Sequence, residues 1–166
     1  MDVLVNNAAF MPMVPFADIT PAIWRQIQTV NVDAPLFLTQ ALAVQMKARG
    51  WGRIVNLASS TVWGPPPGMI AYATSKMGVI GLTRTLASEL GGHGITVNAI
   101  SPGLTRHPGS AAHMPDAAFE GVRARQFIPR TELPDDLTGA LVFLASDAAG
   151  FITGQVLNVD GGGFGF

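Results

Sequence analysis

The sequence predicts an α/β fold in which a doubly wound parallel sheet fills one domain, residues 1–166. Two observations carry this prediction. Four short apolar runs are rich in β-branched residues and do not alternate with polar positions, as is typical of strands covered by helices on both faces. Helical patterns lie between these runs, and strands that alternate with helices form parallel sheets.

The four predicted strands are followed by small or polar residues. The strands are Asp2–Ala8, Arg53–Ala58, Ile95–Ser101 and Gln155–Val159. Ligands of open parallel sheets bind beyond the carboxyl ends of the strands, so the residues at those ends are candidates for a binding site. They are Asn6-Asn7-Ala8-Ala9, Ser59-Ser60 and Ser101-Pro102-Gly103-Leu104-Thr105.

Three helices are predicted between the strands. The first begins at Thr20-Pro21, where threonine is a good N-cap and proline suits the first helical position, and it runs towards Gly50. The second covers about Met69–Leu90 and the third runs from about Pro134 to Ser146. Arg106–Arg130 has weak periodicity and is predicted to be a mobile loop with a short helix.

Composition excludes several classes of function. The 166 residues are 48% hydrophobic and 13% charged, which predicts a sizeable core rather than disorder. A net charge of −1 without a basic block argues against nucleic acid and membrane surfaces as partners. Without cysteine there is no disulfide, thiol nucleophile or zinc–thiolate site, and no metal site is expected; a reducing cytoplasm fits this composition. No apolar run is long enough to span a bilayer, and the N-terminus does not read as a signal peptide.

Tyr72, the only tyrosine, stands four residues before Lys76 in a predicted helix. This spacing places both side chains on one helix face. An adjacent positive charge favours the phenolate, so we expect Lys76 to lower the pKa of Tyr72. The alternative is a tyrosine on a core helix next to a solvated lysine.

Further motifs accompany this pair over nearly the whole chain. They are Asn6-Asn7-Ala8-Ala9, Asn31, Ser59, Pro102-Gly103, Leu144-Ala145-Ser146-Asp147, Gly154-Gln155 and Val159-Asp160-Gly161-Gly162. In this order, with Ser59 thirteen residues before Tyr72, they resemble the short-chain dehydrogenase/reductase family. The resemblance implies a partial Rossmann-like sheet, the later strands and helices of a family domain, with a substrate-loop segment at about 104–132.

The activity implied by the resemblance is hydride transfer between NAD or NADP and a small-molecule carbonyl/alcohol substrate. Tyr72 would be the general acid/base, Lys76 would lower its pKa and bind the nicotinamide ribose, and Ser59 would bind the substrate oxygen. Ser60 is better interpreted as a residue whose hydroxyl forms hydrogen bonds with backbone groups at the end of the strand. Asn31 completes the implied catalytic set.

The resemblance also implies the residues that contact the cofactor. Asn7 and Ala8 would pass beside its adenosine half, and Tyr72, Lys76, Pro102, Gly103 and Thr105 would surround its nicotinamide half. Nothing in the chain discriminates NAD from NADP. His107 stands where the family often has threonine, which is a departure from the pattern.

Pro35 gives Asn31 a physical role of its own. Proline has no N–H and crowds the carbonyl four residues earlier, which is that of Asn31. The resemblance implies that this carbonyl holds a water in a proton relay to Lys76. The alternative is an ordinary proline kink with a solvated carbonyl.

The glycine-rich turn that cradles the cofactor pyrophosphate in the family has no counterpart in this chain. We therefore expect a chain truncated at its N-terminus: a fragment, a start placed too late, a natural short product, or a remnant. Two functional hypotheses follow, an active oxidoreductase or an inactive fragment that serves as an oligomerisation or interaction module. The apolar faces of the helices at 26–49 and 71–90 predict a homo-oligomer, dimer or tetramer, in either case.

Overall fold

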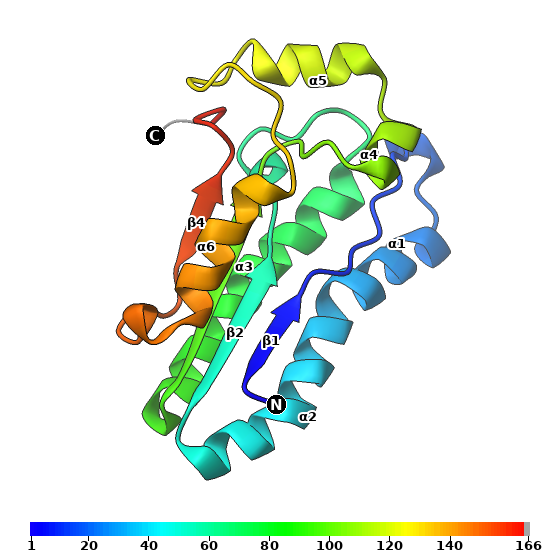
Figure 1. The fold of residues 1–166 in the computed structure, drawn as a ribbon. Coiled ribbons are helices and arrows are strands. Elements are labelled where there is room, and N and C mark those ends of the chain that lie inside the picture. Colours follow the sequence, from blue (N-terminus) through cyan, green and yellow to red (C-terminus); the bar gives the residue numbers. More distant parts are fainter. Residues whose placement is uncertain (165–166) are drawn as a thin grey trace.

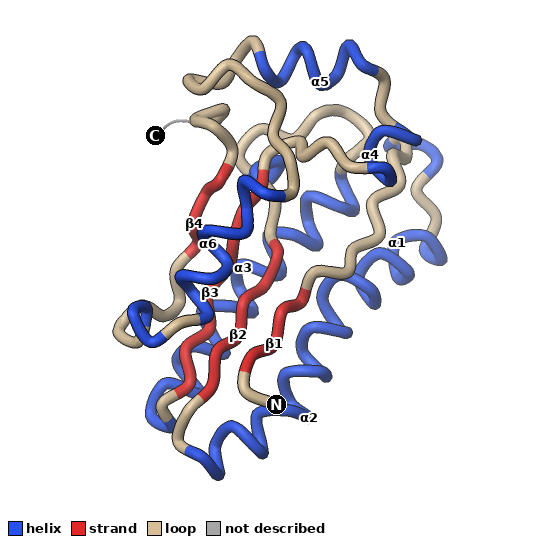
Figure 2. Tube along the Cα trace, in the orientation of Figure 1, coloured by secondary structure: helices blue, strands red, loops and turns tan. Residues whose placement is uncertain are grey.

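A computed structural model describes residues 1–164, which form a four-stranded parallel sheet with helices on both faces (Figure 1). The strands follow one another across the sheet in chain order, all parallel (Figure 2). They are β1 (Val3–Asn6), β2 (Gly52–Leu57), β3 (Ile95–Pro102) and β4 (Val156–Val159). The α/β prediction is confirmed, with every strand in the expected place.

Register brings the ends of β1 and β2 to nearly the same level, while β3 continues beyond them to Pro102. Asn6 pairs with Asn56, and Asn56 pairs with Ala99 on β3. The Asn6 side chain donates to the Asn56 side chain (2.7 Å), which donates to the Thr83 hydroxyl (2.9 Å). These buried bonds tie the carboxyl ends of two strands to a helix, so the residues beyond the strands share one edge.

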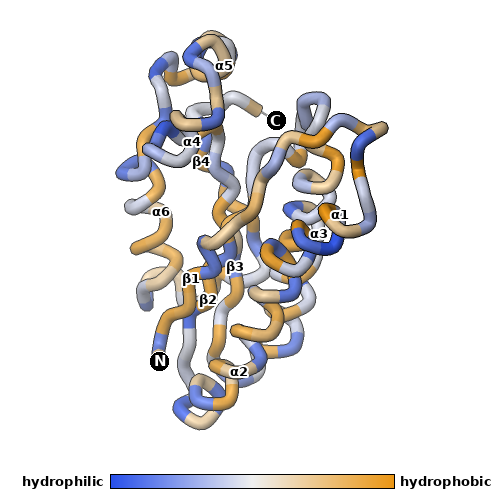
Figure 3. The backbone as a smooth tube through the Cα atoms, turned by 90° about the vertical axis from the view of Figure 1, so that its right-hand side faces the viewer, coloured by the Kyte–Doolittle hydropathy of each residue, from blue (hydrophilic) through white to orange (hydrophobic). Residues whose placement is uncertain are grey.

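Two long helices cover one face of the sheet. They are α2 (Ala34–Arg49) and α3 (Ile70–Leu90), and Met46 and Leu90 on them pack with Leu4, Ile54 and Ile95 of the strands. The other face is covered by α6 (Asp135–Ala145), whose Leu144 packs with Val55 and Ile100. Figure 3 shows α6 as a mostly hydrophobic helix beside the strands. Within residues 1–164, no helix has the length and apolar character of a membrane span.

β1 lies at an edge of the sheet, and its two faces differ in burial. Leu4 is 8% exposed beneath α2 and α3, whereas its neighbour Val5 on the opposite face is 37% exposed. Such an edge strand presents unpaired backbone groups to other chains.

The first predicted helix is interrupted. The structure has α1 (Pro21–Gln28), a π-helical turn at Thr29–Asp33, and then α2. Pro35 has no backbone N–H with which to donate a hydrogen bond. The wide π-helical turn just before it accommodates the missing bond. The predicted ends are confirmed: the Thr20 hydroxyl accepts from the Ile23 N–H (3.3 Å), and Gly50 ends α2 in the left-handed conformation (φ 68°).

The segment predicted as a loop with one short helix contains two helices, α4 (Pro108–His113) and α5 (Asp116–Arg123). His107, which departs from the family pattern, caps α4 by accepting from the Gly109 N–H (3.2 Å). Arg106 pairs with Asp116 (2.6 Å) and stacks 4.7 Å from the ring centroid of Phe119. The sequence pattern indicated only one short helix here, because helices of six and eight residues are too short to show a clear periodicity.

Gly94 closes the turn between α3 and β3, and its replacement should be costly. Its φ is 73°, and a Cβ there would lie 2.2 Å from the Gly50 carbonyl oxygen. We expect Gly94→Ala to lower the free energy of unfolding by about 2–4 kcal/mol, because the conformation and the space both exclude a side chain. Gly92→Ala is the control, since a Cβ at Gly92 meets open space. Urea denaturation measures both, and equal midpoints would contradict this account.

Candidate active site

Ser59 lies immediately beyond β2 and begins a 3-10 turn at Ser60–Val62. Its hydroxyl oxygen accepts from the Thr61 N–H (3.3 Å) and from the Thr61 hydroxyl (2.8 Å), and it is hydrogen-bonded to Tyr72. Ser60 is buried in the turn, where its carbonyl accepts from the Trp63 N–H (3.0 Å). The structure therefore brings Ser59 together with Tyr72.

Tyr72 lies in the first turn of α3 and is 7% exposed. Burial raises the pKa of the Tyr72 phenol, and the hydrogen bond with Ser59 opposes this rise only in part. The expectation that Lys76 brings this pKa down is not met in this structure, because burial outweighs the opposing hydrogen bond with Ser59 and the net effect is a rise. Tyr72 is therefore a neutral phenol that can donate a proton at neutral pH.

Lys76 lies one turn further along α3 and is 3% exposed. Its ammonium nitrogen donates to the Leu57 carbonyl at the end of β2 (2.6 Å) and lies 5.7 Å from the ring centroid of Tyr72. Burial lowers the pKa of Lys76 to about 8. The solvated-lysine alternative is thereby excluded.

The Asn31 side chain connects the loop after β1 to the first turns of α3. Its side chain exchanges hydrogen bonds with the Phe10 backbone, from the Phe10 N–H (2.8 Å) and to the Phe10 carbonyl (3.0 Å). It also donates to the Ser75 hydroxyl (2.9 Å), which donates to the Tyr72 carbonyl (2.7 Å). These contacts of the Asn31 side chain were not predicted, since Pro35 gave an expectation only for the Asn31 carbonyl.

The residues expected to hold the cofactor lie beyond the ends of β1 and β3. Asn7 and Ala8 are exposed after β1, whereas Pro102, the last residue of β3, and Gly103 and Thr105 beyond it are half-buried. The Gly103 N–H donates to the Val159 carbonyl of β4 (3.2 Å). Figure 1 shows these segments at the same end of the sheet as the start of α3, the helix that carries Tyr72 and Lys76.

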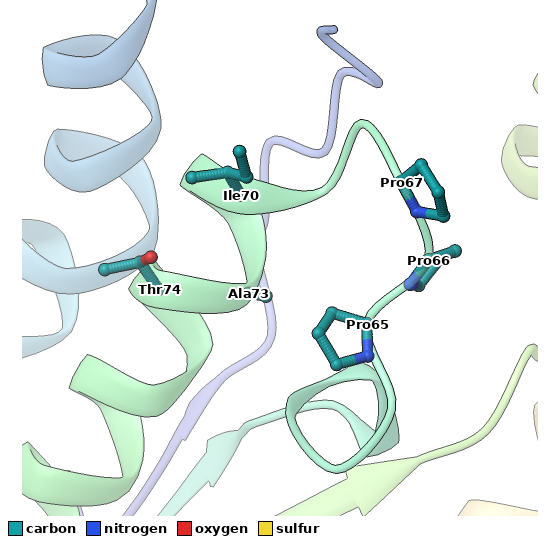
Figure 4. Close-up of a pocket in the computed structure, with 6 residues that line it drawn as sticks. All are labelled: Pro65, Pro66, Pro67, Ile70, Ala73 and Thr74. Atoms are coloured by element: carbon teal, nitrogen blue, oxygen red, sulfur yellow. The ribbon is translucent and has the colours of Figure 1, made fainter. Parts of the chain in front are cut away.

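Two features of this edge were not predicted. Glu132, 5% exposed, accepts hydrogen bonds from the loop after β3. A groove of about 420 Å³ opens where α3 begins (Figure 4). Its lining is Pro65, Pro66, Pro67, Ile70, Ala73 and Thr74. Across residues 1–164, no three His, Asp or Glu side chains are grouped to hold a metal ion.

Comparison with known proteins agrees with the fold. A protein-family model described as Enoyl-(Acyl carrier protein) reductase matches residues 1–163. A 3alpha-hydroxysteroid dehydrogenase of Mediterraneibacter gnavus is 41% identical over 162 residues, 97% of this chain and 64% of that protein. The chain thus spans just under two thirds of this relative.

Two solved structures are closely similar. A gluconate 5-dehydrogenase from Burkholderia cenocepacia J2315 in complex with NADP and tartrate superimposes with a TM-score of 0.92. It is 36% identical, and the match covers 98% of this chain and 64% of that one. A 4-hydroxyisoleucine dehydrogenase complexed with NADH has a TM-score of 0.90 and 32% identity, over 99% and 70% of the two chains.

The fold makes this chain an α/β protein with a Rossmann-like parallel sheet. Its sequence places it more narrowly, and the chain belongs to the short-chain dehydrogenase/reductase family. Relatives in this family bind NADP or NADH, in agreement with the expected cofactor.

Proposed function

We propose that this chain acts in an NAD(P)-dependent oxidoreductase that transfers hydride between the nicotinamide and a carbonyl/alcohol substrate. The observation that carries the proposal is the buried group of Ser59, Tyr72 and Lys76 at the carboxyl end of β2. The rival hypothesis, an inactive interaction module, has no support from the named relatives, which are dehydrogenases.

Tyr72 is the proton donor in the reducing direction. Its pKa is raised by burial, so the phenol keeps its proton at neutral pH and can give it to the carbonyl oxygen as negative charge develops there. Ser59, which is hydrogen-bonded to Tyr72, would donate to the same oxygen and stabilise that charge. In the oxidising direction the phenol must first lose its proton, which its raised pKa disfavours.

Lys76 supplies the positive charge of the site. An ammonium has three N–H donors, and the Leu57 carbonyl takes one of them (2.6 Å). The donor chemistry of Lys76 and the exposed residues Asn7 and Ala8 fit a nucleotide with ribose hydroxyls. The cofactor, when bound, supplies or accepts the hydride. We assign the nicotinamide half to Tyr72, Lys76, Pro102, Gly103 and Thr105, and Asn31 to positioning of α3.

The groove at the start of α3 lies next to the catalytic group without including Ser59, Tyr72 or Lys76, and its apolar lining suits the remainder of a small, largely apolar carbonyl substrate. Three prolines, Ile70 and Ala73 line it with one hydroxyl, that of Thr74, and Ala73 follows Tyr72 in the chain. In the substrate-loop segment at 104–132, Phe119 is buried under Arg106 and is not exposed to a substrate.

A homo-oligomer in the cytoplasm completes the proposal. Phe37 and Val44 on α2 are 61% and 69% exposed, and Met77 on α3 is 50% exposed. Large apolar side chains exposed on adjacent helices suit burial against a second copy. The cysteine-free composition fits a reducing compartment. Sedimentation velocity tests the assembly, and a monomer at micromolar concentration would exclude it.

Cofactor titration tests the proposed activity. We expect the fluorescence of NADH or NADPH to change on addition of the chain, with reduction of a carbonyl substrate followed by loss of cofactor absorbance. No change at millimolar cofactor, together with no turnover, would exclude the enzymatic function for this chain. Membership of the family would stand, since it rests on sequence and fold.

A further inference from the structure

Glu132 is a buried carboxylate that lies against the loop after β3. The residue belongs to the segment between α5 and α6 and is 5% exposed. Its backbone forms a parallel bridge with Thr105, and its carbonyl accepts from the Arg106 N–H (2.8 Å). The backbones of the two segments are therefore paired independently of the Glu132 side chain.

The carboxylate itself binds the loop at two points. One oxygen accepts from the Gly103 N–H (2.9 Å), and the other accepts from the Thr105 hydroxyl (2.5 Å). An ionised carboxylate can only accept, and hydrogen bonds to it are stronger than those between neutral groups. Glu132 thus spans the turn from Gly103 to Thr105 from its buried side.

Space at Gly103 is shaped by the same carboxylate. A Cβ on Gly103 would lie 2.6 Å from a Glu132 carboxylate oxygen and 3.2 Å from the Asp160 Cβ. A side chain at this position would therefore displace the Glu132 carboxylate and press on Asp160. Burial raises the pKa of the Glu132 carboxyl, with Asp136 and Asp160 acting in the same direction, and the two hydrogen bonds oppose the rise.

We propose that Glu132 is a positioning residue that sets the shape of the Pro102–Thr105 loop, and through it the affinity for the nicotinamide end of the cofactor. The part that concerns affinity rests on the proposed function. The Gly103 N–H also donates to Val159 (3.2 Å), so β4 holds one end of the loop, and Glu132 adds the bond to Thr105 that determines the other.

Glu132→Gln tests the proposal with little change in volume. The amide replaces one accepting oxygen with a donor, so it cannot accept from both Gly103 and Thr105. We expect the Kd for NADPH or NADH to rise about tenfold, the effect of losing one charge-assisted bond. Glu89→Gln, the same change on the exposed surface of α3, is the control and should leave the Kd unchanged.

A double-mutant cycle separates positioning from general destabilisation. Thr105→Val removes the hydroxyl that donates to Glu132, and it should also weaken cofactor binding. If the carboxylate acts through this hydroxyl, the loss in the double variant will be clearly smaller than the sum of the two single losses. Additive losses, or a Kd for Glu132→Gln within twofold of the parent, would overturn the proposal. Should Glu132→Gln not fold, an unchanged Kd for Thr105→Val overturns it alone.

A second readout does not depend on cofactor. The amide proton of Gly103, followed by NMR, should move upfield in Glu132→Gln because a charged acceptor is lost. If the parent chain binds no nicotinamide cofactor, the proposed function fails, and this resonance still decides whether Glu132 shapes the loop. A shift no larger than that in Glu89→Gln would overturn the proposal.

Discussion

Tyr72→Phe should lower the turnover number for carbonyl reduction by about 10²–10⁴-fold, the contribution usual for a positioned acid/base. The ring remains, so packing in the first turn of α3 is kept, while the proton that reaches the substrate oxygen is lost. Ser59 keeps its contacts with Thr61 in the variant, so its own position should not change. The result expected is a folded protein without chemistry.

The measurement pairs turnover with binding. Cofactor Kd from fluorescence titration should agree between Tyr72→Phe and the parent, because the phenol acts on the substrate oxygen. Turnover should be followed in the 166-residue chain and in a longer form that carries the glycine-rich segment of the family. Turnover of Tyr72→Phe within tenfold of the parent in the longer form would remove Tyr72 from the role assigned to it.

Lys76→Met should abolish a pH dependence of stability as well as most activity. The folded pKa of Lys76 is about 8, against an ordinary value of 10.5. Between these values the unfolded chain binds more protons than the folded one, so the free energy of unfolding rises with pH. Across the whole window this amounts to about 3 kcal/mol. Below pH 8 Lys76 is protonated in both the folded and the unfolded chain. Its contribution to the free energy of unfolding is then constant and at its least favourable.

Urea denaturation at several values between pH 8 and pH 10 measures this effect. The upper limit of pH 10 avoids the titration of Tyr72. Because the pKa of Tyr72 is raised from its ordinary value of 10.0, this residue lowers the free energy of unfolding only above pH 10. Lys47→Met is the matched control, because Lys47 is exposed on α2. We expect the slope to persist in Lys47→Met and to vanish in Lys76→Met. An equal slope in both variants would mean that Lys76 is not buried as the structure has it.

Much of the site could be predicted because its signals are local. Four residues along a helix place Tyr72 and Lys76 on one face whatever the rest of the fold does. Thr20 and Gly50 mark helix ends through their own conformations. The family motifs added roles to these positions, and no local signal contradicted them.

Glu132 shows what local signals cannot reveal. It contacts Gly103 from a position 29 residues further along the chain, across a segment with two helices where the sequence indicated only one. Asn31 is similar, since its side-chain partners Phe10 and Ser75 are 21 and 44 residues away. Contacts at such separations depend on how the segments pack.

By itself, the sequence determined the α/β class, the order of the strands along the chain and the spacing of Tyr72 and Lys76. Only the tertiary structure decided the electrostatics of that pair. Burial raises the pKa of Tyr72 and lowers that of Lys76, opposite to the effect expected of the phenol from its neighbour alone. The reason is physical: the cost of losing solvent is set by every atom packed around a group, and those atoms come from segments distant in sequence.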